Sequence, residues 1–396
     1  MKHVRILLLS ALLALAHPLA SAANECTASC KRGIGEALAL EGQGKFQEAL
    51  DKYRSVEKAE PLASLPVSLA AGLMLRLAPQ VKPDKVKQWR DTARAMAMRA
   101  TRLDPDDPIA HETLRMLDDD GVSPLRPLNA RAAALHDEAE NHFSQGQFKE
   151  ALQKYEAAMA ADPQSSMPLV GAGDCYFMQK DWPRAETLFR RATGIEPHNS
   201  QAWRFLSDAL LYQDQRAAAE QALLSAIAAD PSQRPNWSKL SALRADAGAG
   251  KPLTSLALRR GVRVVPPNDG GKYTLEIDEQ VLDKAPTHDQ AFRIALGSAE
   301  INLRMADQHK QRSAYDIELA SWRMALTIAD ELEAKRGNRF SEPGLQRMQA
   351  LAKAGQLEAA ILLLQFRQSY RPALDAWLAA NPDGVRQFID RHGLQP

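Results

Sequence analysis

Residues 146–163 read GQFKEALQKYEAAMAADP, and this stretch returns in altered form as KDWPRAETLFRRATGIEP at 180–197 and DQRAAAEQALLSAIAADP at 214–231. The spacing is 34 residues each time, without a gap. Within each copy apolar residues recur at the intervals of an amphipathic helix, and small alanines stand where a second helix can approach closely. Each copy ends on an acid–proline pair, and proline ends a helix because it lacks a backbone N–H. The stretch therefore predicts an all-α fold of stacked helical hairpins.

This repeat resembles the tetratricopeptide repeat (TPR) family in its period and in its signature positions. In a unit numbered from 132 those positions hold Gly146, Phe148, Ala151, Tyr155, Ala158 and Pro163. In the units from 166 and 200 they hold Gly173, Tyr176, Trp182, Ala185, Phe189, Ala192 and Pro197, and then Trp203, Leu206, Ala219, Ala226 and Pro231. The resemblance implies a TPR helix-turn-helix superhelix, an α-solenoid, in which the first helix of each unit lines a concave groove.

Outside the strict repeat the pattern weakens in both directions. We expect degenerate TPR-like helices at 23–121, a linker at 122–131, three regular units plus a following helix at 132–247, a loop with a possible small β-hairpin at 248–285, and a helical C-terminal region at 286–396. The hairpin is predicted because Pro266–Gly271 separates two β-branched and aromatic runs, Val262–Val265 and Tyr273–Ile277.

The C-terminal region departs from the 34-residue period. A capping-box sequence begins at Thr287 and predicts a helix to about Met305, and Ser313 is placed to cap a second helix that packs against it. Further on, Gly355 and Leu357 echo the repeat register, whereas Arg367 occupies a position that the TPR signature gives to alanine. The region is interpreted as a degenerate repeat or as a helical cap that shields the last apolar face of the array.

The first 22 residues have the organisation of a bacterial secretory signal peptide. Lys2 and Arg5 precede the apolar run Ile6–Ala16, which is too short to cross a bilayer as a helix. Pro18 and the small residues Ala20–Ala22 then offer a cleavage site after Ala22. We therefore expect a periplasmic protein with no membrane span in the mature chain; a buried N-terminal helix is the alternative.

The charge and the cysteine content of the chain argue against several classes of function. The chain has 396 residues, 50 Lys and Arg against 49 Asp and Glu, and a formal charge of +1, which argues against a broadly basic nucleic-acid-binding protein. Cys26 and Cys30 lie four residues apart and form a disulfide candidate in an oxidising compartment, with two free thiols as the alternative. The CTASCK sequence around them matches neither a thioredoxin centre nor a haem attachment motif.

No catalytic or cofactor motif is evident. Gly248–Lys251 lacks the Ser or Thr and the earlier glycine of a phosphate-binding loop, and no GxSxG or HExxH sequence occurs. His136 and Glu140 share a helix face, where a solvated pair is the ordinary interpretation and a metal site the rarer one. We therefore expect no catalytic residue, no metal and no cofactor.

The TPR resemblance implies which side chains line the groove. These are His136, Glu140, Phe143 and Ser144 in the first strict unit, Val170, Asp174, Phe177 and Met178 in the second, and Arg204, Asp208, Leu211 and Tyr212 in the third. The carboxylates Glu140, Asp174 and Asp208 share one repeat position, so the groove would suit a protein or peptide segment with basic and apolar side chains. Pairing of Glu140 with His136 and of Asp208 with Arg204, which would leave a face without a specific ligand, is the alternative.

These features predict a non-catalytic exported scaffold or adaptor that binds a protein or peptide segment in its groove, in envelope assembly or secretion. A chaperone would use the same groove for many clients. An enzyme or sugar-binding protein, with the TPR units as a docking platform, is the alternative from a different class. Its candidate polar groups in the C-terminal third are Glu276, Asp278, Glu279, His288 and His309. The sequence gives no indication of oligomeric state.

Overall fold

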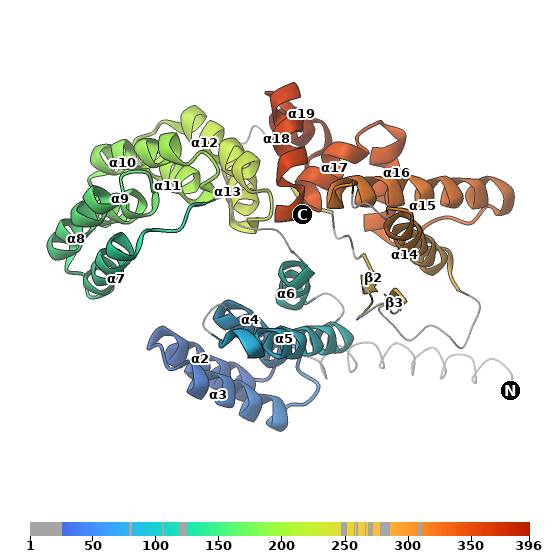
Figure 1. Cartoon of the computed structure of the whole chain (residues 1–396), viewed down its shortest axis with the longest axis horizontal. Coiled ribbons are helices and arrows are strands. Elements are labelled where there is room, and N and C mark those ends of the chain that lie inside the picture. The colour runs from blue at the N-terminus through green and yellow to red at the C-terminus, as the bar shows by residue number, and fades with distance from the viewer. Residues whose placement is uncertain are drawn as a thin grey trace, which may run out of the picture. The chain divides into compact units, whose positions relative to one another are not determined.

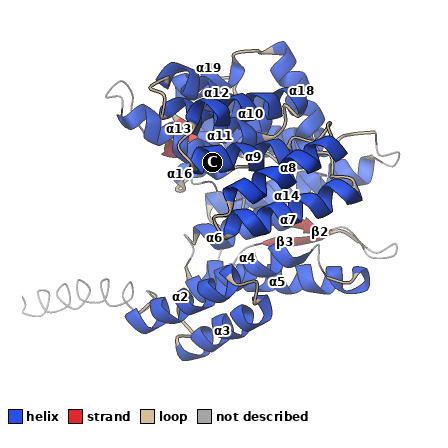
Figure 2. Cartoon of the chain, turned by 90° about the vertical axis from the view of Figure 1, so that its left-hand side faces the viewer, coloured by secondary structure: helices blue, strands red, loops and turns tan. Residues whose placement is uncertain are grey.

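A computed structural model describes residues 26–396 except 79–80, 105–106, 119–124, 247–251, 257, 259, 266, 268–271, 278–285 and 308–310. The predicted signal peptide lies outside the described residues. The chain divides into two compact units, residues 1–120 and 121–396. Helices make up most of the described chain, as Figure 2 shows. None of the described helices combines the length and the apolarity needed to cross a bilayer.

The first unit consists of helices that pack mainly against their neighbours in the chain. They are α2 (Ala28–Gly42), α3 (Phe46–Ala59), α4 (Leu65–Leu77), α5 (Pro83–Leu103) and α6 (Pro108–Asp118). Gly44, with φ of +73°, makes the turn between α2 and α3, and Tyr53 and Leu73 are fully buried in the core. The weaker upstream repeat therefore still folds as a helical hairpin.

The strict repeat forms an array of paired helices in the second unit. These are α7 (Ala130–Ser144), α8 (Phe148–Ala161), α9 (Met167–Met178), α10 (Trp182–Ile195), α11 (Ser200–Leu211), α12 (Arg216–Ala229) and α13 (Arg234–Asp246). In the arc that they form, α8, α10 and α12 lie on the outer side, and α7, α9, α11 and α13 on the inner side (Figure 1). The all-α TPR-type architecture predicted from the 34-residue period is confirmed.

In two of the three acid–proline pairs, the acid joins the end of a second helix to the start of the first helix of the same hairpin. Asp162 accepts a hydrogen bond from the backbone N–H of Asn129 at 3.0 Å, and Glu196 accepts from the backbone N–H and the hydroxyl of Ser166 at 2.7 and 2.6 Å. Each of these two acids thus binds the residue that precedes the first helix of its own hairpin. Because hydrogen bonds to a charged acceptor are stronger than neutral ones, these contacts hold together the open end of the hairpin, where its first helix begins and its second ends.

The C-terminal region begins with the predicted hairpin. Strands β2 (Val262–Val265) and β3 (Thr274–Ile277) pair antiparallel, with Val262 opposite Ile277. The other elements are β1 (Thr254–Ser255), α14 (His288–Ala306), α15 (Ala314–Arg336), α16 (Pro343–Lys353), α17 (Leu357–Leu364), the 3₁₀ helix η2 (Gln368–Tyr370), α18 (Arg371–Ala380), α19 (Gly384–His392) and β4 (Leu394–Gln395). Capping boxes at Thr287 and Ser313 start α14 and α15, which pack together as expected.

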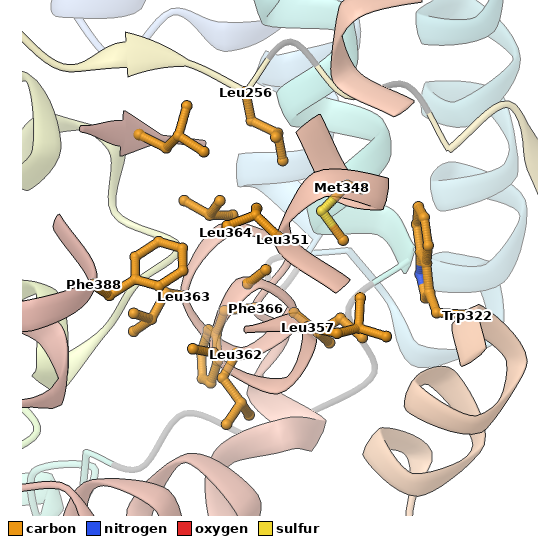
Figure 3. Close-up of a cluster of buried hydrophobic side chains, with 14 of the residues drawn as sticks. Leu256, Trp322, Met348, Leu351, Leu357, Leu362, Leu363, Leu364, Phe366 and Phe388 are labelled. Atoms are coloured by element: carbon orange, nitrogen blue, oxygen red, sulfur yellow. The ribbon is translucent and has the colours of Figure 1, made fainter. Parts of the chain in front are cut away.

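One hydrophobic core joins the end of the array to the C-terminal region. Trp237 of α13 belongs to the same buried cluster as Trp322, Phe366 and Phe388. Figure 3 shows the α17 end of this cluster, with Leu362 and Leu364 among its side chains. The polar edge of the junction is formed by Glu220 on α12, which accepts hydrogen bonds from Arg244 and Arg386. The C-terminal helices thereby cover the last apolar face of the repeat array, which would otherwise meet solvent.

Candidate functional site

The side chains predicted to line a groove come from α7, α9 and α11, which contact one another in sequence. We call the surface of these three helices the inner face, after their place in the arc (Figure 1). Helix spacing explains why the predicted residues share a side, since positions three, four and seven apart lie along one stripe. Val170 departs from the expectation: it is only 6% exposed and packs in the core.

Of the three carboxylates that share a repeat position, Glu140 is the one that is most open to solvent. Its side chain is 52% exposed, and one of its oxygens lies 3.5 Å from Nε2 of His136. The same carboxylate accepts a hydrogen bond of 2.6 Å from the hydroxyl of Tyr155, which reaches it from α8. The His136–Glu140 pairing that was considered as an alternative is therefore present, and Tyr155 adds a contact that orients the carboxylate.

Asp208 is paired with a residue outside the three strict repeat units. Lys239 of α13 forms an ion pair with its carboxylate. Arg204, the partner considered from sequence, instead directs its guanidinium toward Asn236, with Nη1 3.4 Å from Oδ1. Lys239 belongs to the helix after the third strict unit, and so no repeat position pointed to it. The charge of Asp208 is therefore partly balanced by that of Lys239.

Asp174 lies between the other two carboxylates in the repeat and is partly buried. Burial, together with the negative charges of Glu140 and Asp208, raises the pKa of Asp174 to about 7, while Arg204 opposes the rise. The neighbouring thiol of Cys175 has its pKa raised to about 12, chiefly by burial and next by Asp174. Loss of solvent and the proximity of like charges both disfavour the charged form of an acid.

An aromatic cluster stands at the end of the inner face where first helices turn into second helices. The ring of Tyr212 stacks on that of Trp182, with centroids 4.4 Å apart and planes at 15°, and Phe177 meets both rings edge-on. Tyr212 and Met178 are 62% and 57% exposed. We call Phe177, Met178, Trp182 and Tyr212 the aromatic rim.

Phe143 makes a similar edge-on pair with Phe148 one unit earlier, at centroids 5.6 Å apart. Trp182 was recognised in the sequence only as a signature residue of the second unit, and its role in the rim was missed. The signal existed, because Phe148 and Trp182 are 34 residues apart and each follows a phenylalanine by five. Leu211 is partly buried and packs against two core clusters.

The polar groups considered for a C-terminal active site do not converge where they are described. Glu276 pairs with Arg263 across the β2–β3 hairpin at 3.1 Å, whereas the ring of His288 packs on Phe340 with centroids 4.8 Å apart. Asp278, Glu279 and His309 lie outside the described residues. In the parts of the chain that the structure describes, no three metal-binding side chains gather.

In the first unit the structure joins Cys26 and Cys30 by a disulfide, with Cα atoms 5.3 Å apart. The bridge closes a single turn at the start of α2, where the side chain of Thr27 accepts a hydrogen bond from the backbone of Cys30. Cys175 is a free, buried cysteine.

A comparison with known protein families identifies the type of repeat. A family model described as tetratricopeptide repeat matches residues 142–195 and 177–243. The matched segment, from the end of α7 to α13, is thus of the tetratricopeptide repeat type. No curated protein sequence is a significant match.

Solved structures resemble parts of the chain. The first TPR domain of human RPAP3 is 19% identical over 30% of this chain and 94% of its own, with a TM-score of 0.29. The Sgt2 TPR domain from Aspergillus fumigatus is 19% identical over 34% of this chain and 93% of its own, with a TM-score of 0.28. MamA protein is 16% identical over 56% of this chain and 94% of its own, with a TM-score of 0.28. Structural similarity at these TM-scores does not indicate which ligand or partner the chain binds.

Proposed function

We propose that the chain is a non-catalytic exported scaffold or adaptor that binds a protein or peptide segment on its inner face, in envelope assembly or secretion. The observation that carries this proposal is the aromatic rim, where Met178 and Tyr212 expose more than half of their surface beside the carboxylates of the same face. Exposed aromatic and methionine side chains that lie together are typical of protein-binding surfaces.

The charges of the inner face refine the expected partner. Lys239 pairs with Asp208, and the guanidinium of Arg204 interacts electrostatically with both Asp208 and Asp174, so the face is less acidic than three repeated carboxylates suggest. Glu140 remains the exposed acid. The partner we propose supplies an apolar or aromatic side chain to the rim and a basic side chain to Glu140, where electrostatic complementarity adds specificity.

Partner capture from a periplasmic extract, followed by mass spectrometry, tests the binding proposal. The variant to compare is Glu140→Lys with Tyr212→Ser, because both side chains are largely exposed; thermal unfolding shows whether loss of the hydrogen bond from Tyr155 to Glu140 has altered the fold. The matched control is Glu150→Lys with Ile328→Ser, which makes the same kinds of change at exposed positions of α8 and α15. We expect the first variant to lose the partner that the wild type and the control retain. If all three proteins recover the partner equally, the inner face is not the binding site.

Export is tested separately. Intact-mass measurement of the chain recovered from its source cell is expected to give a protein that begins at Ala23, and fractionation is expected to place it in the periplasm. A chain that keeps Met1 and stays with the cytoplasmic fraction would contradict the location while leaving the binding proposal standing.

A further inference from the structure

The disulfide of the first unit joins two residues of one helical turn rather than two elements of the fold. Cys26 and Cys30 are four residues apart, with Cα atoms separated by 5.3 Å, at the start of α2. A disulfide stabilises a fold mainly by closing a loop in the unfolded chain, and this effect is smallest for the shortest loops. The bridge therefore adds less to stability than one that joins distant segments, and its opening separates no two helices.

The start of α2 is also fastened by other contacts. The backbone N–H of Thr27 donates a hydrogen bond of 3.1 Å to the carboxylate of Glu60, which follows α3, and the hydroxyl of Thr27 donates to the same carboxylate. The oxygen of that hydroxyl accepts the backbone N–H of Cys30, as a helix cap does. Because none of these contacts passes through a sulfur atom, we expect α2 to keep its start when the bridge is open.

The two bridged cysteines differ in exposure. Cys30 is 1% exposed and belongs to the buried cluster of the first unit, whereas Cys26 is partly exposed and packs against that cluster. In thiol–disulfide exchange the attacking thiolate bonds to one sulfur while the other leaves as a thiolate, and access helps to decide which sulfur is attacked. The geometry makes Cys26 the attacked sulfur and Cys30 the leaving one.

The surroundings of Cys30 suit a leaving thiolate. It lies in the first turn of α2, a helix of 15 residues whose N-terminus carries a partial positive charge. A hollow of about 200 Å³ between α2 and α3 is lined by Cys30, by Arg32 and by the ion pair of Lys52 with Glu36. The other carboxylate on the hollow, that of Glu60, is bound to the start of α2. A helix start and a nearby cation stabilise a thiolate against the cost of burial.

We propose that Cys26–Cys30 is a redox-active disulfide that exchanges with a dithiol. A thiolate of the dithiol forms a bond to Sγ of Cys26, the bond between Cys26 and Cys30 breaks, and its electron pair leaves with Sγ of Cys30. The second thiolate of the dithiol then attacks the dithiol sulfur of the mixed disulfide and releases Cys26 as a thiolate. The dithiol is thereby oxidised to a disulfide, and the two reduced cysteines take up the two protons that it loses. The exchange requires no ligand on the inner face, so it stands or falls independently of the proposed binding.

Reduction of the native protein tests the exchange. The disulfide-bonded chain is treated with dithiothreitol in the absence of denaturant and then with N-ethylmaleimide, and the alkylated cysteines are identified by mass spectrometry. We expect both Cys26 and Cys30 to be alkylated while the helical signal in far-UV circular dichroism is retained, with the buried thiol of Cys175 as the unreactive control. A bridge that opens only in denaturant, or whose opening abolishes the helical signal, would overturn the proposal.

The direction of attack is read from the mixed disulfide of the wild-type chain with glutathione. Acid quenching traps this species, and fragmentation of the peptide that contains both cysteines locates the glutathione. We expect it on Cys26, and glutathione found mainly on Cys30 would overturn the assignment.

Two single variants give a second measurement of the same direction. Cys30→Ser leaves Cys26 as a free thiol, and Cys26→Ser leaves Cys30. Because Cys30 is buried, we expect oxidised glutathione to modify Cys26 at least about tenfold faster than Cys30. Equal rates in two variants that retain the helical signal would contradict the assignment.

Discussion

At the scale of single residues, the turn inside each repeat unit uses one backbone conformation with three different residues. Gly146, Lys180 and Asp214 occupy the same place in successive units, 34 residues apart, with φ of +73°, +63° and +58°. Glycine adopts this left-handed region freely, whereas a side chain makes it costly. The second and third units therefore contain a local strain that the first unit avoids.

Lys180→Gly is expected to stabilise the protein by about 1 kcal/mol, because relief of the left-handed strain exceeds the added entropy of the unfolded chain. Chemical denaturation measures the change. The matched substitution is Gly146→Lys, where a Cβ has open space around it, so that its cost is purely conformational and should be of similar size. Loss of stability in Lys180→Gly would refute the interpretation.

The pKa of Asp174 also predicts how stability depends on pH. Its value is about 7 in the folded chain against 3.8 for an ordinary aspartate, so between these values the folded state holds a proton that the unfolded state releases. The free energy of unfolding should therefore fall as pH rises from about 4 to 7, by up to about 4 kcal/mol from this group. Asp174→Asn should remove this slope, so that the variant gains on the wild type with rising pH. Parallel pH profiles for the two proteins would show that the carboxyl is not perturbed.

At the scale of helices, much of the fold could be predicted because its signals are local. The helix-capping residues Thr287 and Ser313 directly precede the helices that they start. The Pro266–Gly271 sequence likewise stands between the two strands that it separates. The acid–proline pairs follow the second helices that they end. The parallel pairing of β1 with β4 had no such signal, since it joins Thr254 to Leu394.

The candidate site shows the same limit. Its residues could be predicted from repeat positions, but their partners could not. The ion pair of Lys239 with Asp208 crosses from α13 to α11, and the stacking of Trp182 on Tyr212 joins two units. The acid of the acid–proline pair was likewise seen only as a companion of the proline. Its contacts, such as that of Glu60 with the backbone of Thr27, span about one repeat.

Close helix crossings give a prediction at this scale. A Cβ added at Gly173 of α9 would overlap the ring of Phe189 on α10, so Gly173→Ala must displace a buried ring and is expected to cost about 1–3 kcal/mol. Gly194→Ala on α10 is the control, since nothing lies within 4 Å of the added atom, and it should be neutral or stabilise by about 0.5 kcal/mol. Thermal unfolding measures the stability of both variants. Equal changes in stability would contradict the close contact between Gly173 and Phe189.

At the scale of the whole molecule, the end of the repeat array and the C-terminal region depend on each other through one buried core. Gly355, between α16 and α17, has φ of +71°, the conformation of Gly146, and this agrees with a degenerate repeat. The second helix of that hairpin ends at Leu364, before Arg367, so the arginine at a signature alanine position does not enter a helix crossing. The C-terminal helices thus bury the last face of the array in a shared core, and the inner face remains the surface for which we propose a partner.

The most direct test of that proposal is photo-crosslinking from the aromatic rim in cells. Tyr212 is replaced by p-benzoylphenylalanine, which keeps an aromatic ring at the exposed position, and Ile328, also exposed but on α15, receives the same residue as a control. We expect a discrete crosslinked product to another polypeptide from position 212 and none of the same size from position 328. Absence of any product at 212, or the same product from both positions, would contradict the proposal.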